Sequence, residues 1–408
     1  MAEVTITRLG LHGDGIADGP IYVPRSLPGE LVTGELDGQV LRDVKIVSPS
    51  DQRVSPPCRH FKACGGCQLQ HASDQFVAEW KVDVVRKALE VHGLETDFRA
   101  LHTSPPASRR RAGFAAKRTK KGATVGFYGR ASDVIVDIPE CRLLAPEVLA
   151  ARQVAEELAM AGASRKAALA VLVTASRTGL DVSVSDGKDL DGPLRQQLAR
   201  LCEQHRLARL SWGDEVIAMR APPLQSFDGI DVSPPPGAFL QATTEGQECL
   251  IEAVKEIAAG SRQIVDLFAG CGTFGLPLSR QAEVHAVESD RSMLDALDAA
   301  WRHAQGLKRV TTEARDLFRR PLLADELAKA DLVVLDPPRA GAEAQIATLA
   351  DSNTPRIAYV SCNPVTFARD AAVLTAAGFT LDWIQVVDQF RWSAHVELAA
   401  SFTASHMR

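Results

Sequence analysis

The chain has 408 residues, of which 46% are hydrophobic and 24% are charged, and its formal net charge is −5. This length suits two or three domains, and the small net charge means that a nucleic-acid partner has to be argued from local basic patches. No run of about 18 apolar residues occurs, and the start MAEVTITRLG lacks the features of a secretory signal, so we expect a cytoplasmic protein without a membrane partner.

The predicted elements divide the chain into three parts. Residues 1–52 hold short β-type runs separated by glycine and aspartate turns, which predict a small N-terminal β-barrel of the OB type. Residues 53–232 begin with a proline-containing linker and a helix that ends near Gly93, then mix strands with helices, as in an α+β region. In residues 233–408 helices alternate with strands, which predicts an α/β Rossmann-like domain whose ligand lies beyond the carboxyl ends of parallel strands.

Four cysteines of the central region form a candidate metal site. Cys58, Cys64 and Cys67 follow the pattern C-x5-C-G-G-C, and Cys141 comes later in VDIPECRLL. In a reducing compartment such a cluster is more typical of a metal site than of disulfides. Four thiolates can hold zinc or a 4Fe-4S cluster, and a spacing unlike the paired C-x2-C of zinc ribbons favours the 4Fe-4S cluster.

The segment SRRRAGFAAKRTKKGATVGFYGR, residues 108–130, carries eight basic residues, three aromatic residues and no acidic residue. It predicts a β-hairpin that can neutralise phosphates while its rings offer stacking surfaces. On this basis we expect Arg110, Lys117 and Lys120 to bind RNA. A solvated hairpin with charges around a tight turn is the alternative.

A glycine-containing turn opens the predicted cofactor site. DLFAGCGTFG, residues 266–275, ends a strand and turns through Gly270 and Gly272, a spacing closer to S-adenosylmethionine-binding turns than to the dinucleotide motif of dehydrogenases. Glu288 closes the next predicted strand, where a carboxylate can bind both hydroxyls of a ribose. Asp316 lies where a carboxylate would meet an adenine amino group. A turn required only for packing is the alternative.

Two further polar residues end predicted strands, Asp336 in VLDPP and Cys362 in YVSCNP. Both should therefore line the carboxyl edge of the sheet. A thiolate is nucleophilic enough to add to a pyrimidine ring carbon, whereas a small buried hydrophobe is the alternative for a lone cysteine. His395 and Glu397 follow on a predicted final strand.

The motifs DLFAGCGTFGLPL, VLDPPRAG, YVSCNPVTFARD and HVELAASF, in this order, resemble the RNA uracil-5 methyltransferases that use S-adenosylmethionine. The motif CRHFKACGGCQLQHAS with the later Cys141, after a barrel similar to a TRAM domain, resembles the iron-sulfur members that modify 23S ribosomal RNA. The resemblance covers nearly the whole chain. It implies a monomeric methyltransferase that acts on RNA, not on DNA.

The resemblance also implies roles for single residues. Cys362 attacks C6 of the target uracil, and Glu397 removes the C5 proton after methyl transfer. Phe239 is positioned to stack on a base. Contacts with S-adenosylmethionine are implied at Gln241, Phe268, Gly270, Gly272, Glu288, Asp316 and Asp336.

Some motif positions depart from the family. Where members usually have Q-x-N this chain has Gln241-Ala242-Thr243, and Phe390-Arg391-Trp392-Ser393 replaces F-P-x-T. The alternatives are a tRNA uridine or an RNA cytosine as target, or an iron-sulfur RNA-binding protein with reduced catalysis. An RNA cytosine-5 enzyme usually carries two active-site cysteines, and an amino-group methyltransferase has an aromatic residue after D-P-P, whereas this chain has one such cysteine and DPPR.

Overall fold

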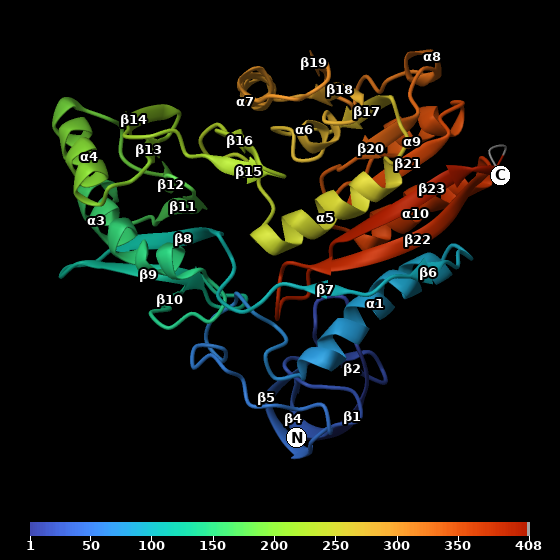
Figure 1. Ribbon diagram of the computed structural model, residues 1–408. Coiled ribbons are helices and arrows are strands. Elements are labelled where there is room, and N and C mark those ends of the chain that lie inside the picture. Colours follow the sequence, from blue (N-terminus) through green and yellow to red (C-terminus); the bar gives the residue numbers. More distant parts are fainter. Residues whose placement is uncertain (406–408) are drawn as a thin grey trace.

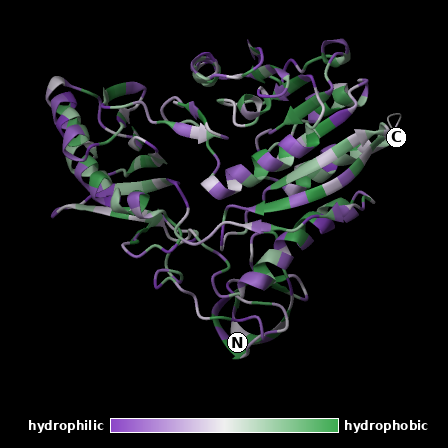
Figure 2. Ribbon diagram, in the orientation of Figure 1, coloured by the Kyte–Doolittle hydropathy of each residue, from purple (hydrophilic) through white to green (hydrophobic). Residues whose placement is uncertain are grey.

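The computed structural model describes residues 1–405. Figure 1 shows three parts: a barrel at the N-terminus, a central sheet with helices, and a large C-terminal α/β layer structure. In Figure 2 the strands of the C-terminal sheet are largely hydrophobic, whereas polar residues follow the outer helices. Within the described chain, every helix is too short or too polar to cross a membrane.

The N-terminal part is a closed five-stranded barrel, as expected from the sequence. Its strands follow the order β1-β2-β3-β5-β4. Ile6, Val23, Val32 and Leu41 fill its interior. The strands are β1 (Ala2–Leu9), β2 (Gly15–Ala17), β3 (Ile21–Val23), β4 (Leu31–Asp37) and β5 (Val40–Ser48).

The central part is a seven-stranded sheet with helices against it. The basic segment forms the predicted hairpin, β8 (Arg111–Arg118) and β9 (Ala123–Tyr128), in the strand order β10-β9-β8-β11-β12-β13-β14. The other strands are β10 (Ile135–Asp137), β11 (Leu169–Ser176), β12 (Gly179–Ser185), β13 (Arg209–Trp212) and β14 (Glu215–Met219). The helices are α2 (Pro146–Ala150), α3 (Arg152–Gly162) and α4 (Gly192–Gln204), and a separate short hairpin follows, β15 (Gln225–Phe227) with β16 (Ile230–Val232).

The C-terminal part is a mostly parallel sheet with helices on both faces. Its strand order is β19-β18-β17-β20-β21-β23-β22-β6, and the pairs between β19 and β21 are all parallel. These strands are β17 (Gln263–Leu267), β18 (Glu283–Glu288), β19 (Val310–Ala314), β20 (Leu332–Leu335), β21 (Arg356–Ser361), β22 (Phe379–Asp388) and β23 (Leu398–Ala404). The helices are α5 (Thr244–Ile257), α6 (Gly275–Leu278), α7 (Arg291–His303), α8 (Ala324–Leu327), α9 (Glu343–Ala350) and α10 (Pro364–Ala376).

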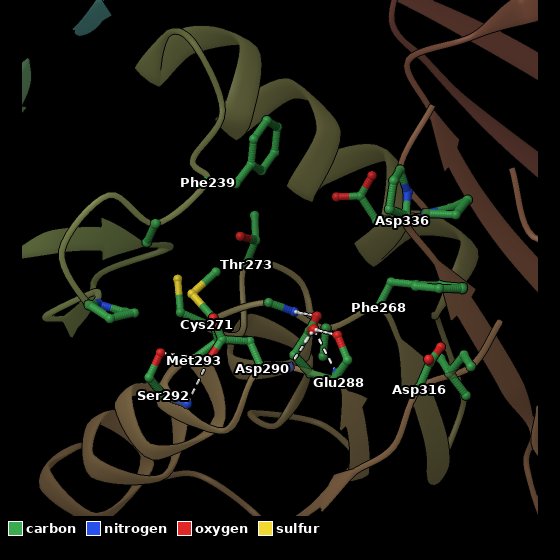
Figure 3. Close-up of a pocket in the computed structure, with 18 of the residues that line it drawn as sticks. Phe239, Phe268, Cys271, Thr273, Glu288, Asp290, Ser292, Met293, Asp316 and Asp336 are labelled. Atoms are coloured by element: carbon green, nitrogen blue, oxygen red, sulfur yellow. Dashed lines mark hydrogen bonds between the residues drawn. The ribbon is translucent and has the colours of Figure 1, made fainter. Parts of the chain in front are cut away.

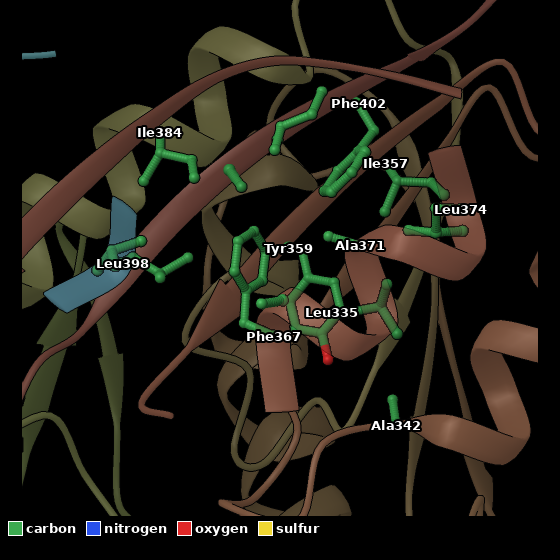
Figure 4. Packing of buried hydrophobic residues seen from close by; sticks show 14 of the residues in the cluster. Leu335, Ala342, Ile357, Tyr359, Phe367, Ala371, Leu374, Ile384, Leu398 and Phe402 are labelled. Atoms are coloured by element: carbon green, nitrogen blue, oxygen red, sulfur yellow. The ribbon is translucent and has the colours of Figure 1, made fainter. Parts of the chain in front are cut away.

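Aromatic packing fixes one face of this sheet (Figure 4). The ring of Tyr359 meets that of Phe367 edge-on at 5.3 Å, and Phe367 lies 6.3 Å from Phe402. The Tyr359 hydroxyl donates to Asp370 Oδ2 at 2.7 Å, so its polar end is satisfied inside the core. This packing holds α10, which begins two residues after Cys362, against strand β21.

Residues from the first quarter of the chain complete the C-terminal sheet. Strands β6 (Asp97–Phe98) and β7 (His102–Thr103) both pair in parallel with β22. Helix α1 (Asp74–Glu90), which Ser73 caps by accepting from Phe76 N at 3.2 Å, buries Val77, Trp80 and Val84 in the same core. The segment assigned from the sequence to the central region therefore packs with the C-terminal sheet (Figure 1).

Candidate active site

A cavity of about 620 Å³ opens at the carboxyl edge of the C-terminal sheet (Figure 3). The loops after β17, β18, β19, β20 and β21 all contribute to its wall. Of the predicted site residues, it is lined by Phe268, Gly270, Glu288, Asp316, Asp336, Cys362 and Glu397. Gln241 and Gly272 do not line it.

The glycine turn after β17 has the conformation that its sequence predicts. Gly270 and Gly272 have φ of 55° and 92°, and Phe268 between strand and turn also has a positive φ of 59°. A Cβ at position 272 would lie 2.8 Å from Leu276, so this glycine permits close packing behind the cavity. Asp266 Oδ2 accepts from Gly275 N at 2.8 Å, and burial raises the pKa of Asp266 to about 8.

Glu288 joins two loops at the cavity wall. Its Oε2 accepts from Gly270 N at 3.1 Å, and its Oε1 accepts from Asp290 N at 3.0 Å. Further along, Asp316 Oδ1 accepts from Phe318 N at 3.0 Å, and the Phe318 ring lies 5.5 Å from that of Phe268. The sequence prediction missed Phe318, although its place two residues after Asp316 was a usable signal.

Gln241 is buried behind the cavity rather than in its wall. Its side-chain oxygen accepts a hydrogen bond from Gln389 Nε2, and its backbone oxygen accepts from Arg110 Nε at 3.1 Å. Gln389 was also missed, because a single glutamine in a polar loop is ordinarily solvated and no spacing marks it.

Cys362 lies between the end of β21 and the start of α10. Asn363 caps this helix by accepting from Val365 N at 3.1 Å, and its Nδ2 donates to Arg339 O at 2.8 Å. These bonds hold the loop after Asp336 against the loop that carries the thiol. The thiol therefore faces the cavity from a fixed strand end, as predicted.

Glu397 lies in the loop before β23, with only 2% of its surface exposed. The strand predicted to include His395 and Glu397 begins only at Leu398, so both residues precede it. Val387 N donates to Glu397 O at 2.7 Å, which fixes the backbone of the glutamate next to the end of β22. His395 Nδ1 lies 3.3 Å from an Arg339 guanidinium nitrogen.

Burial and neighbouring negative charges raise the pKa values of the acidic groups in the cavity. Burial raises the pKa of Glu397 to about 7, partly opposed by hydrogen bonds from Gln389 and Gln241. Burial, then the charges of Glu397 and Asp336, raise the pKa of Cys362 to about 11. Burial and the charge of Glu397 also raise the pKa of Asp336 well above its usual value. A positively charged ligand would favour the ionised forms.

The four predicted metal-binding cysteines, Cys58, Cys64, Cys67 and Cys141, come together around one small cavity, which we call the cysteine cavity. Phe61, Phe127 and Ile138 are among the other residues that line it, and all four thiols are free. Within residues 1–405, no three His, Cys, Asp or Glu side chains are arranged closely enough to hold a metal ion. The structure thus shows the gathering of the thiols but not a formed metal site.

One expectation for the basic hairpin is wrong. Arg110 is only 7% exposed, and its guanidinium donates to Gln247 Oε1 at 2.7 Å and to Gln225 Oε1 at 3.3 Å. It joins the central and C-terminal parts and is not free to bind phosphate. Lys117 and Lys120 are exposed, as expected.

Comparison with known proteins places the chain among RNA-modifying enzymes. Residues 233–404 match the family described as tRNA (Uracil-5-)-methyltransferase. An uncharacterized RNA methyltransferase of Rhizobium meliloti is 43% identical over 407 residues, which cover 98% of both chains. The 23S rRNA (uracil(1939)-C(5))-methyltransferase of Halomonas elongata is 31% identical over 97% of this chain and 88% of its own.

The chain belongs to the RNA uracil-5 methyltransferase family. It is accordingly an RNA (uracil-5-)-methyltransferase. A solved structure agrees with the fold: Pyrococcus abyssi tRNA (uracil-54, C5)-methyltransferase, in complex with S-adenosyl-L-homocysteine, has a TM-score of 0.77 at 24% identity and covers 98% of this chain and 99% of its own. The similarity extends beyond the C-terminal sheet to the central part and the barrel.

Proposed function

We propose that this methyltransferase methylates C5 of a uridine in 23S ribosomal RNA through a covalent adduct, with S-adenosylmethionine as methyl donor. The observation that carries the proposal is the convergence of Cys362 and Glu397 on the same cavity as Glu288 and Asp316. A nucleophile, a base and a nucleoside-binding wall are thus within one space.

The wall of the cavity fits a cationic nucleoside. When bound, S-adenosylmethionine supplies an electrophilic methyl group on a positively charged sulfur. Glu288 would hold the ribose hydroxyls and Asp316 the adenine amino group, with the rings of Phe268 and Phe318 beside the base. Gly270 and Asp336 would line the same site, whereas Gln241 and Gly272 would support it from behind. Phe239, which is 61% exposed at the cavity mouth, would stack on an RNA base.

The proposed chemistry uses Cys362 as nucleophile, Glu397 as base and a neighbouring carboxylate that accepts the thiol proton. The Cys362 thiol passes its proton to a neighbouring carboxylate such as Asp336, and the thiolate bonds to C6 of the uracil. The C5–C6 π electrons move onto the C4 oxygen, and the enolate returns them as C5 bonds to the methyl carbon. The electron pair of the broken sulfur–methyl bond remains on the donor sulfur. Glu397 then takes the C5 proton, C5=C6 re-forms, and Cys362 leaves as the thiolate.

We propose that the cysteine cavity holds a 4Fe-4S cluster. Four thiols from two separate segments face one space with apolar walls, a donor set that suits such a cluster or zinc. Protein purified without oxygen should contain about four iron and four sulfide per chain. One zinc per chain without iron would contradict this assignment.

We further propose 1–52 as a TRAM-like RNA-contacting domain and 233–408 as the methyltransferase domain. In the proposed central region, 53–232, the segment with α1, β6 and β7 belongs to the methyltransferase sheet. The choice of 23S ribosomal RNA is supported by the Halomonas relative, which is named as a 23S rRNA methyltransferase and aligns with all three parts of this chain. A tRNA uridine is the second candidate, because the description of the matched family names tRNA as the substrate. Nucleoside mapping of 23S ribosomal RNA and tRNA from cells with and without the protein decides between them.

The test of the mechanism is a trapped intermediate. Glu397→Gln should still add Cys362 to the base and transfer the methyl group, but it should not release the product, because proton removal is the last step. A slow-migrating protein–RNA band should appear on a denaturing gel, and Cys362→Ala should abolish it. Folded Glu397→Gln protein without such a band contradicts the role of Glu397, and a trapped cytosine contradicts the uracil assignment.

A further inference from the structure

Gln389 lies directly behind the carboxylate of Glu397. It follows the end of β22, is 1% exposed, and faces Glu397 across the loop that joins β22 to β23. The preceding Asp388 is anchored by a buried ion pair with Lys81 of α1 at 2.5 Å. The backbone of Gln389 is therefore fixed by a contact that does not involve the active site.

All four hydrogen-bonding positions around the Gln389 amide have partners. Its Oε1 accepts from Ala242 N at 2.7 Å and from Thr243 N at 3.4 Å, while its Nε2 donates to Gln241 Oε1 and to Glu397 Oε2. Because backbone N–H groups can only donate, the amide oxygen must face them, and the NH₂ group must face Glu397. The orientation of the amide is thus set by its surroundings.

We propose that Gln389 is the positioning residue of the proton-removal step, because its amide donates to Oε2 of Glu397 and so fixes the carboxylate that lines the cavity. This inference rests on the proposed function, in which Glu397 removes the C5 proton. A carboxylate with one oxygen tethered from behind presents the other in a defined direction, as a general base requires.

The same hydrogen bond acts on the charge of Glu397. A donor to the carboxylate stabilises its ionised form, so Gln389 lowers the pKa of Glu397, and Gln241 acts likewise. The other titratable groups facing this corner are Asp336 and Cys362, and both interact with the Glu397 charge. The positive charge of Arg339 lowers the pKa of Cys362 and so opposes the effect of the two carboxylates. Loss of the Gln389 donor should therefore raise the pKa of Glu397 from about 7.

Gly246 offers a second way to disturb Gln389 without changing its chemistry. A Cβ built at this position of α5 would lie 2.7 Å from Gln389 Cβ and 3.3 Å from its Oε1. The backbone of Gly246 needs no unusual torsion, so Gly246→Ala should push on Gln389 and remove no donor or acceptor. The added Cβ would also lie 2.8 Å from Thr243 Oγ1, which caps α5 by accepting from Gly246 N. Gly246→Ala should weaken the tether to Glu397 less than removal of the amide does.

The experiment measures release of methylated RNA from the covalent adduct in single-turnover reactions. Gln389→Met, which keeps the side-chain length, should slow release roughly tenfold at neutral pH, because the lost bond is one to a charged group. The methylated adduct should accumulate, the KM for RNA should stay within about twofold, and the pH midpoint for release should move upward. Gly246→Ala should show the same changes to a smaller extent.

Gln345→Met is the matched control. Gln345 is equally buried, accepts from Leu322 N at 2.9 Å and donates to Leu322 O at 3.1 Å, and neither residue lines the catalytic cavity. It should lose stability without accumulating adduct. If Glu397→Gln traps adduct but both Gln389→Met and Gly246→Ala release product with wild-type rate and pH profile, the inference is wrong. If Glu397→Gln traps nothing, the proposed function fails first.

Discussion

The catalytic cavity and the cysteine cavity gather reactive side chains in different ways. Cys362 and Asp336 end neighbouring parallel strands, and Glu397 precedes the strand that pairs with β21. The four cysteines lie outside the named strands and helices, and their two segments are tied to the central part by the bridges Cys64–Gly129 and Arg109–Leu144. Residues at strand ends inherit their geometry from the sheet, whereas the cysteine segments are held by individual hydrogen bonds, such as that from Gly65 N to Tyr128 O.

The largest effect that we expect is the loss of methyl transfer, without a loss of stability, when Cys362 is replaced. Cys362→Ala should lower methyl transfer at least about a thousandfold, because Cys271, which also lines the cavity, is only 1% exposed and burial raises its pKa to about 12. The thermal midpoint should hardly change, since the strand end is fixed by backbone bonds. Cys249→Ala, at a half-buried cysteine of α5, is the control and should keep its activity. A Cys362→Ala enzyme that still methylates would show that the strand-end thiol is not the nucleophile.

The next expected effect is the pH dependence of product release. A general base acts only when ionised, so the release rate should fall up to tenfold per pH unit as the pH drops below about 7, the raised pKa of Glu397. Release should level off above that pH. Quenched single-turnover reactions at pH values from about 5 to about 9 measure the release rate. A release rate that rises as the pH falls would mean that Glu397 acts as an acid.

Replacing one cysteine tests whether the cysteine cavity needs a ligand for its geometry. Cys141→Ser should lose most of the bound iron and lower the thermal midpoint by several degrees, because the remaining turns lose their cross-link. Iron content and a melting curve under anaerobic conditions give both values. Unchanged stability with lost iron would mean that the turns hold their geometry without the cluster.

The smallest effect concerns the basic hairpin, which contributes Phe127 to the cysteine cavity. The double variant Lys117→Ala, Lys120→Ala should weaken RNA binding a few-fold. It should also lower the slope of the logarithm of the RNA-binding constant against the logarithm of salt concentration by about one to two, because each exposed lysine that binds a phosphate releases counterions from the RNA. Arg110→Met should instead reduce stability, since it breaks buried bonds to Gln247 and Gln225. Binding titrations at several salt concentrations separate the two. A stable Arg110→Met protein with weaker RNA binding would reverse this division.

Most of the site residues predicted from the sequence line the catalytic cavity, because several of them sit at predictable strand ends. Glu288, Asp336 and Cys362 follow from strand position plus motif. Gln389 could not be predicted, because its role depends on an amide contact formed between distant segments. Arg110 was assigned to phosphate binding because a run of arginines has the same sequence pattern whether it faces solvent or a neighbouring domain. Burial, which decides between these readings, is a property of the assembled fold.

The pairing of β6 and β7 with β22 affects any attempt to produce the catalytic half alone. A fragment starting at residue 233 would leave β22 as a long, bare edge strand and strip α1 from the core that it covers. Such an edge recruits other chains, so the truncated protein should aggregate during expression. Supplying residues 73–104 as a separate peptide, or rejoining them to the fragment by circular permutation, should restore solubility. The catalytic unit is thus discontinuous along the gene although continuous in space.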